Sequence, residues 1–157
     1  MSADGNFYAK RRSVLARKMS SEPIKDTDLK TILNAGIRVP DHGALNPWKI
    51  TVINKETQKI IDEQIILSEY KKENPDANEQ NLQIEANRLQ RASVVLAVLS
   101  TPVDHPKISN WEMVLSSGAV CMNLLSCEQS LGYAAQWLTE WYAYNEKILE
   151  YLGGRPN

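Results

Sequence analysis

The chain has 157 residues and carries 18 lysines and arginines against 19 aspartates and glutamates, a net charge of −1. This balance argues against a protein that binds nucleic acid or an anionic membrane surface, because such proteins usually carry a basic excess. No apolar run is long enough to span a bilayer, and the N-terminal stretch MSADGNFYAKRRS lacks the apolar core of a signal peptide, so we expect a cytoplasmic protein.

The first half of the chain predicts two helices, a strand and a third helix. Residues 6–18 have helical character near their start and are basic near their end. Thr27 is the expected N-cap of a helix with apolar residues at helical spacing, which should stop before Pro40 because the residue preceding a proline avoids helical backbone angles. The alternating segment WKITVIN (48–54) predicts a strand, and a helix is expected at about 56–70.

The middle of the chain changes from polar to apolar. Residues 71–91 are polar, and Pro75 is expected to divide them into a loop and a second, solvated helix, the least packed part of the chain. The continuous apolar run SVVLAVLST (93–101) predicts a central strand covered on both faces.

Residues 110–131 predict a long apolar helix. Its middle carries the small residues Ser116–Ala119, which would let another backbone approach closely, and Gly132 should end it. A short strand and a last helix at about 142–152 are expected after it. These elements predict one α+β domain over residues 1–157. A helix that is apolar nearly all round needs burial on every side, which favours a homodimer.

Cysteine and histidine are scarce. Cys121 and Cys127, the only cysteines, lie six residues apart on the predicted long helix and so point to different faces, which favours two core thiols over a disulfide. With only His42 and His105 as further soft ligands, we expect no zinc site.

Two segments could bind a ligand. Arg11, Arg12 and Ser13 offer forked donors and a hydroxyl to a phosphate, although paired arginines on a helix more often form a solvated face. In PDHGALNPW (40–48), the prolines restrain a backbone whose polar side chains could read the edge of a planar ring. The alternative is a turn in which aspartate and asparagine satisfy local backbone groups, and no nucleophile supports a hydrolytic triad.

Aromatic residues gather late in the chain, at Trp137, Trp141, Tyr142 and Tyr144. Such density indicates core or interface packing first and the wall of a flat pocket second. Neither a dinucleotide-binding glycine pattern nor a P-loop is present, so a nucleotide cofactor would be held in another way.

Taken in order, RRS, AGIRVPDHGALNPW, WEMVLSSGAVCMNLLS and LGYAAQW resemble the FMN-dependent nitroreductase family, above all its small bacterial NAD(P)H nitroreductases. The resemblance covers nearly the whole chain. It implies a three-layer fold with a small mixed or antiparallel sheet flanked by helices and a long central dimer helix. It further implies a homodimer with FMN at each end of the interface.

The site residues carry over by position. The resemblance places Arg11, Arg12 and Ser13 at the FMN phosphate and ribityl chain. It brings residues of the proline-rich loop to the flavin from the other subunit: Arg38, Pro40, Asp41, His42 and Asn46. The region of Trp137, Leu138 and Thr139 would run along the isoalloxazine. It implies hydride transfer from NADH or NADPH to the flavin, followed by reduction of a nitroaromatic, a quinone or a related small electrophile, with no side chain as catalytic acid or base.

Two departures from the family bear on this reading. Ala134 and Ala135 stand where similar proteins often have glycines, and the methyl groups would crowd the flavin or shift the strand. Family members usually continue past the segment GGRPN (153–157) into another strand and an arm. We expect the absence of this strand and arm to expose a sheet edge and to weaken both the dimer and the cofactor site.

Other functions stay open beside the reductase. One is a degenerate or truncated flavin-binding dimer with little turnover. Another is a phosphate- or RNA-binding module built on Arg11 and Arg12, which the balanced charge disfavours. The sequence selects neither the electron acceptor nor NADH over NADPH.

Overall fold

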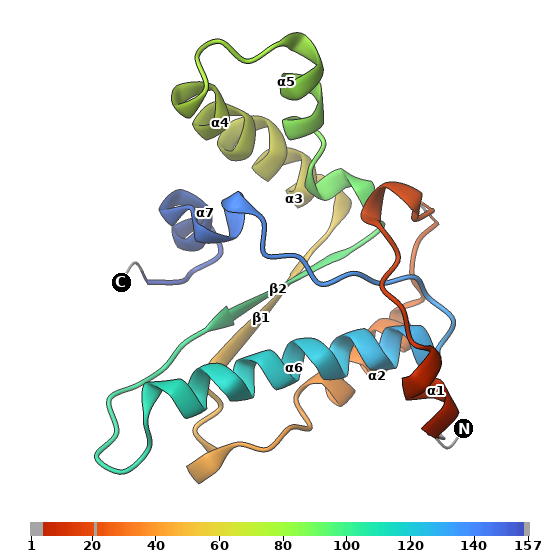
Figure 1. Cartoon of the computed structure of the whole chain (residues 1–157), viewed down its shortest axis with the longest axis vertical. Coiled ribbons are helices and arrows are strands. Elements are labelled where there is room, and N and C mark those ends of the chain that lie inside the picture. The colour runs from red at the N-terminus through yellow and green to blue at the C-terminus, as the bar shows by residue number, and fades with distance from the viewer. Residues whose placement is uncertain (1–4, 21, 156–157) are drawn as a thin grey trace. The chain divides into compact units, whose positions relative to one another are not determined.

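The computed structural model describes residues 5–20 and 22–155. Residues 1–4 of the stretch without a signal-peptide core, Ser21, and the last two residues of GGRPN lie outside the described residues. Within them, helices precede, separate and follow two strands, so the predicted α+β class is confirmed (Figure 1). The chain groups into two compact units.

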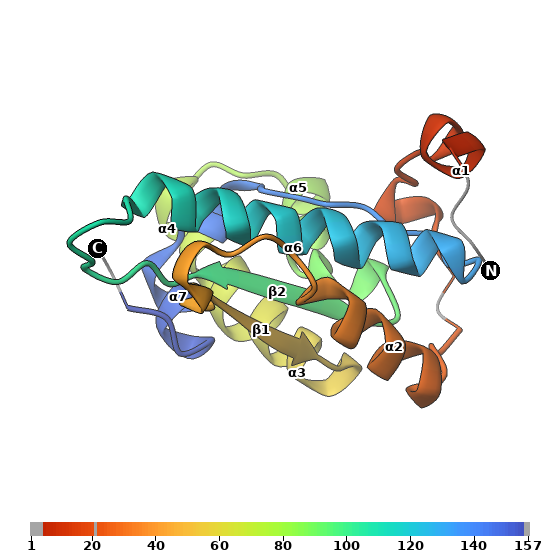
Figure 2. The same ribbon diagram turned by 90° about the horizontal axis from the view of Figure 1, so that it is seen from below.

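The first unit comprises the described parts of Met1–Met19, Ile24–Ile50 and Val98–Trp137. Its helices are α1 (Gly5–Lys10), α2 (Asp26–Gly36) and α6 (Asn110–Ser130), with 3-10 turns at Ala16–Lys18 and His42–Ala44. Helix α2 packs along α6 (Figure 2). Gly36 allows this close approach, because a Cβ at that position would collide with the side chain of Leu124.

Local side-chain chemistry explains both ends of α6. The Ser109 hydroxyl accepts a hydrogen bond from the Glu112 amide, and the Glu112 carboxylate accepts one from the Ser109 amide, which is a capping box. At the other end, Gly132 has a φ of +89°, and the Tyr133 amide donates to the Glu128 carbonyl at 3.0 Å. The predicted helix and its stop are confirmed, and no described helix is long and apolar enough to cross a membrane.

The two strands are β1 (Trp48–Ile53) and β2 (Val95–Ser100), which pair in an antiparallel two-stranded sheet (Figure 2). Both were predicted, but the expectation that β2 is central and covered on both faces is wrong. It has one strand neighbour among the described residues, and Val95–Leu99 are only half-buried. An apolar β-branched run indicates that a strand can be buried, not how many neighbours it has.

The strand predicted after Gly132 is also wrong, because residues 133–140 carry no regular secondary structure. Their backbone forms no ladder, and one hydrogen bond joins it to the N-terminal segment: the Val14 amide donates to the Ala135 carbonyl at 3.0 Å. Ala135 is 4% exposed, so its methyl group is packed inside the protein, whereas Ala134 is exposed.

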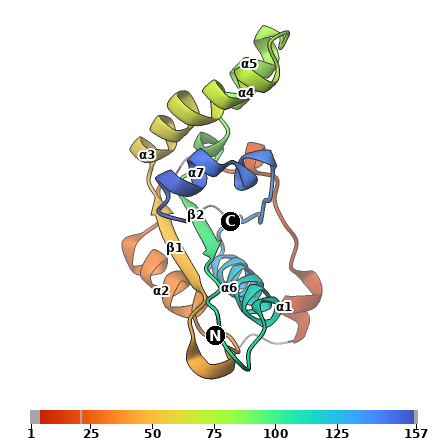
Figure 3. The same ribbon diagram turned by 90° about the vertical axis from the view of Figure 1, so that its left-hand side faces the viewer.

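The second unit comprises the described parts of Ser20–Pro23, Thr51–Ala97 and Leu138–Asn157. A continuous helical rod is built from α3 (Lys55–Ile60), a π-helical turn (Ile61–Ile66) and α4 (Leu67–Glu73), and α5 (Glu79–Glu85) packs on α4 (Figure 3). Two 3-10 turns and a last helix follow: Leu89–Arg91, Trp141–Tyr144 and α7 (Glu146–Tyr151). The core contains Ile53, Ile61, Ile66, Leu89 and Ile148. The helices predicted at 56–70 and 142–152 are thus confirmed, with shifted ends.

Residues 71–91 are only partly the loosely packed segment that the sequence predicts. The loop at Pro75 is present, and α5 follows it. However, Glu85 is 3% exposed and pairs with Arg88 at 2.6 Å, while Leu89 is 8% exposed. A polar composition predicts that a segment is exposed to solvent. A charged residue in it can nevertheless be buried when a partner neutralises its charge.

The predicted N-cap of α2 is wrong as well. The helix begins at Asp26 with Lys25 at its N-cap, and no side chain caps it. Thr27 lies inside the helix, where its carbonyl accepts from the Thr31 hydroxyl at 2.9 Å. Asp26 and Asp28 in the first turn favour the helix start through the positive end of its dipole, so a side-chain cap is dispensable.

Candidate functional site

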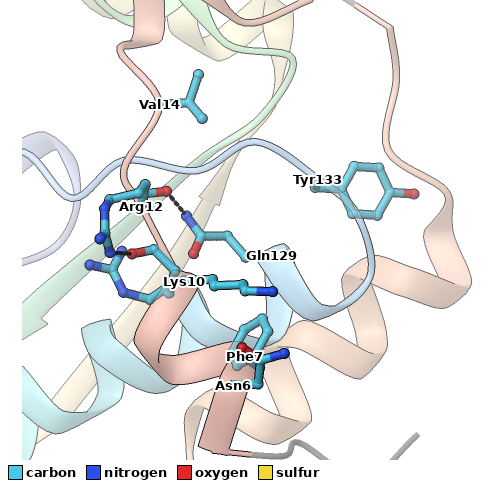
Figure 4. Close-up of a pocket in the computed structure, with 8 residues that line it drawn as sticks. Asn6, Phe7, Lys10, Arg12, Val14, Gln129 and Tyr133 are labelled. Atoms are coloured by element: carbon cyan, nitrogen blue, oxygen red, sulfur yellow. Dashed lines mark hydrogen bonds between the residues drawn. The ribbon is translucent and has the colours of Figure 1, made fainter.

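An open pocket of about 420 Å³ lies where α1 ends, in the first unit (Figure 4). The charged residues that line it are Lys10, Arg11 and Arg12, all of them cations. Phe7 and Tyr133 contribute aromatic rings to the same lining. A hollow that gathers three cations without a lining carboxylate favours an anionic ligand.

The two arginines differ in how their side chains are used. Arg12 folds back, so that its Nη1 donates to the carbonyls of Ala9 and Arg11 at 3.2 and 2.7 Å. The Nη1 of Arg11 is instead buried and has no hydrogen-bond partner in the described part of the chain. A buried donor without a partner is costly, so Arg11 is the pocket arginine that has a donor still available to a ligand. Ser13 is exposed on the outgoing chain.

Gln129 connects this pocket to α6. Its Nε2 donates to the Arg12 carbonyl at 2.6 Å, and its Oε1 is buried without a partner among the described residues. Nearby, the Ala16 amide donates to the Gln136 side chain at 2.7 Å. The segment that carries the arginines is therefore anchored to the C-terminal end of α6 and to the residues that follow it.

The proline-rich loop is fixed by its own backbone geometry. Gly43, Ala44 and Asn46 have φ angles of +77°, +52° and +48°, in the left-handed region that non-glycine residues seldom adopt. The Asp41 carboxylate accepts from the Asn46 amide at 2.7 Å, and the Asn46 side chain donates to the Ala44 carbonyl at 3.0 Å. Asp41 and Asn46 thus fill the local backbone role that the sequence leaves open beside the ring-edge role.

Small residues of α6 hold the flanks of this loop. Ser116 donates to the Pro40 carbonyl at 3.0 Å, and Ser117 donates to the Pro47 carbonyl at 2.9 Å. The Asn123 side chain donates to the Arg38 carbonyl at 2.8 Å. The expectation that the small residues let another backbone approach is confirmed, and the approaching backbone is that of the loop.

His42 stands apart from the other loop residues, because its side chain points to α6 and not to the loop. Its Nδ1 lies 2.9 Å from Oε2 of Glu112, while the two side chains remain 63% and 46% exposed. This hydrogen bond is the main cause that lowers the pKa of the Glu112 carboxyl. The carboxylate of the capping box therefore also orients the imidazole.

The arginine pocket and the loop lie at opposite ends of α6 (Figure 2). Glu112 contacts the loop and Gln129 contacts Arg12, and 17 residues of straight helix separate them by roughly 25 Å. Within one chain, Arg11–Ser13 and the loop residues are therefore not brought together. One ligand of nucleotide size could therefore not contact both groups within a single chain.

Trp137, Leu138 and Thr139 form an irregular stretch instead of a strand. The Trp137 ring is 49% exposed and lies against Gly118, where an added Cβ would be 3.8 Å from it. In the second unit, Leu138 is half-buried and Thr139 is exposed. Glu140, the next residue, forms ion pairs with Arg88 at 2.8 Å and Arg91 at 3.5 Å, which fixes the end of this stretch.

Sequence reasoning missed Gln129 and Glu112. Neither belongs to a recognisable binding motif, since each acts on a residue 70 or more positions away. The S-x-x-E spacing of Ser109 and Glu112 identifies a capping box and so a local role. It carries no signal for the second role of Glu112 on His42.

Solved structures share this fold. A nitroreductase-like family protein from Bacillus cereus superposes with a TM-score of 0.80 over 99% of this chain and 79% of its own, at 20% identity. A nitroreductase with bound FMN from Bacteroides fragilis gives a TM-score of 0.70 over 99% of this chain and 82% of its own, also at 20% identity. The predicted nitroreductase-like fold is confirmed.

Sequence relatives agree with the structures. The protein named "Putative NAD(P)H nitroreductase" in Haemophilus influenzae is 25% identical over 88% of this chain and 74% of its own length. A protein with the same description in Escherichia coli K12 is 23% identical over 92% of this chain and 76% of its own. The sequence model of the nitroreductase family matches residues 8–156, and the chain therefore belongs to the nitroreductase family.

Proposed function

We propose that this protein is an FMN-dependent oxidoreductase that uses NADH or NADPH to reduce nitroaromatics, quinones or related small electrophiles. The observation that carries the proposal is the guanidinium nitrogen of Arg11, which is buried without a partner in the described chain, in a pocket whose charged lining residues are all cations. Membership of the nitroreductase family and the FMN bound in the Bacteroides fragilis relative support it.

The residues around the pocket fit the polar half of FMN. Arg11 offers a buried donor to a phosphate, and Lys10 and Arg12 add positive charge beside it. The free Oε1 of Gln129 offers an acceptor for a hydroxyl group, such as those of the ribityl chain. A ligand with both a phosphate and hydroxyl groups would satisfy the two orphaned atoms at once.

The reductase chemistry would be that of the flavin, which accepts a hydride from a reduced nicotinamide and passes electrons to the second substrate. The contribution of this chain would be to bind and orient. Arg11 would hold the phosphate, and the stiff loop from Arg38 to Asn46 would present its side chains without paying to order its backbone on binding.

A homodimer is part of the proposal, for two reasons. The described chain exposes a stripe of apolar side chains at helical spacing along α6: Trp111, Val114, Leu115 and Met122. Such a patch is typical of a protein interface. A second copy would also supply the loop of Arg38–Asn46, which cannot reach the arginine pocket of its own chain.

The test is the visible absorption spectrum of the purified protein after FMN is added and the excess is removed. We expect a retained flavin spectrum that bleaches with NADH or NADPH under anaerobic conditions. A flavin spectrum that does not bleach would favour the flavin-binding dimer with little turnover. A protein that takes up no FMN would overturn the proposed function.

Arg11→Ala should raise the dissociation constant for FMN roughly tenfold, because one charge-assisted hydrogen bond to the phosphate is lost. The melting temperature of the FMN-free protein should stay the same, since Nη1 of Arg11 has no partner in the described chain. Fluorescence titration with FMN measures the first quantity. Arg17→Ala, which removes an exposed arginine outside the pocket, is the matched control. Equal FMN affinity of the two variants would rule out the role of Arg11.

A further inference from the structure

The contact between His42 and Glu112 is not needed to hold the proline-rich loop. Hydrogen bonds from Asn46 and Ser116 already fix the backbone on either side of His42. An ion pair as exposed as this one adds little to stability. Its effect must therefore be sought in the histidine itself.

The contact decides which ring nitrogen of His42 carries the proton. Glu112 is ionised at neutral pH and can only accept hydrogen bonds, so the Nδ1 that lies 2.9 Å from its Oε2 must be the N–H. In neutral His42 the lone pair is then on Nε2, the ring nitrogen that has no protein partner in the described chain. Nε2 is consequently left to accept a hydrogen bond from a ligand.

We propose that Glu112 is a positioning residue of the flavin site, which holds neutral His42 as its Nδ1–H tautomer so that Nε2 presents an acceptor to an N–H group of the bound ring. The functional part of this inference rests on the proposed function. The tautomer part does not, because it is a property of the protein without FMN.

The second histidine of the chain is a built-in reference. The Nδ1 of His105 accepts from the amides of Lys107 and Ile108 at 3.3 and 3.1 Å, so it carries the lone pair. Neutral His105 is therefore the Nε2–H tautomer, the opposite of His42. Since the sequence contains two histidines, a tag-free sample gives two imidazole patterns of opposite type.

Long-range ¹H–¹⁵N NMR spectra of the FMN-free protein at about pH 8.5, above the ordinary histidine pKa of about 6.5, distinguish the two tautomers. We expect the Nδ1–H pattern for His42 in the wild type. In Glu112→Gln the side-chain oxygen accepts from the Ser109 amide, so the NH2 group faces Nδ1 of His42 and favours the Nε2–H form. Glu112→Ala should shift His42 toward the Nε2–H form. An Nε2–H pattern for His42 in the wild type would overturn the proposal.

A matched variant separates this role from helix capping. Ser109→Ala breaks the capping box of α6 but leaves Glu112 free to contact His42. Glu112→Ala and Glu112→Gln should both weaken FMN binding roughly three- to tenfold, because neither keeps Nε2 of His42 as an oriented acceptor, while Ser109→Ala stays near the wild type. Equal losses in Glu112→Ala and Ser109→Ala would reduce Glu112 to a cap and overturn the positioning role.

The failure of the proposed function has a different signature. A wild-type protein that binds no FMN would remove the flavin site and with it the positioning role. The tautomer of His42 is still decided by the NMR spectra of the same sample. The two failures are therefore distinguishable.

Discussion

Asp62→Ala should lower the free energy of unfolding by about 3 kcal/mol. Asp62 is fully buried in the π-helical turn, where its carboxylate accepts from the Leu89 amide at 2.9 Å and from the amide and side chain of Gln90 at 3.2 and 3.1 Å. Alanine would leave two backbone N–H groups without an acceptor, and each costs about 1–3 kcal/mol when buried.

Urea unfolding of the FMN-free protein measures this effect, and Glu63→Ala is its matched control. Glu63 is the next carboxylate on the same helical rod, but it is half-exposed and lies 3.8 Å from Lys59. We expect the control to change the free energy of unfolding by less than about 0.5 kcal/mol. Similar losses in both variants would show that Asp62 does not organise the turn at Leu89–Arg91.

We also expect Asp62→Ala to affect FMN binding, through residues of the second unit. The turn that Asp62 holds carries Arg91 and follows Arg88, and both arginines pair with Glu140. Glu140 directly follows Leu138 and Thr139, which the family resemblance places along the flavin. Asp62→Ala should therefore also weaken FMN binding, at a temperature where the variant is still folded.

Glu128→Gln should stabilise the protein at pH 8 by about 2 kcal/mol and leave its stability unchanged at pH 4. Burial raises the pKa of Glu128 from 4.5 to about 7, and no described residue forms a hydrogen bond or an ion pair with its carboxyl. This rise corresponds to about 3 kcal/mol, which we reduce because the side chain keeps partial contact with water.

The direction of this pH dependence follows from the pKa of Glu128 in the folded and in the unfolded state. The folded pKa is the higher one, so the folded state binds more protons between pH 4.5 and about 7, and stability falls as the pH rises through this window. Above about pH 7, Glu128 is charged in both states, and its desolvation destabilises only the folded state. Glutamine removes that cost, whereas at pH 4 both side chains are neutral.

Urea unfolding at pH 4 and pH 8 tests this prediction. Glu150→Gln is a suitable control, because Glu150 is an exposed carboxylate near the C-terminal end of α7. We expect the control to respond equally at the two pH values. A Glu128→Gln variant that is no more stable than the wild type at pH 8 would show that the carboxylate finds a partner or water in solution.

The elements of the fold could be predicted wherever their signals are local. The start of α6 depends on Ser109 and Glu112, three residues apart, and its end depends on the freedom of Gly132 to adopt a positive φ. The alternation in β1 and the proline after α2 act over similarly short distances. The segments Arg11–Ser13 and Arg38–Asn46 could be identified as binding candidates because residue type limits their chemistry.

Two of the predictions that were wrong depend on partners far away in the sequence. Whether β2 is central depends on which strands pair with it. Whether Glu85 is buried depends on Trp141, which donates to it from 56 residues away, as well as on the nearby Arg88. From the sequence alone, a polar residue is predicted to be exposed, because the partner that allows its burial is not known. Periodicity and composition contain no information about such pairs.

The sequence by itself determined the helix boundaries that have local caps, both strands, the α+β class and the types of residue that could bind an anion or a ring edge. Only the tertiary structure decided which of those residues are free to act. It folds Arg12 onto its own backbone, leaves Nη1 of Arg11 without a partner in the described chain, and joins His42 to Glu112 across 70 residues. The physical reason is range: a cap or turn is decided within a few residues, whereas hydrogen-bond partners across the chain exist only after packing brings them together.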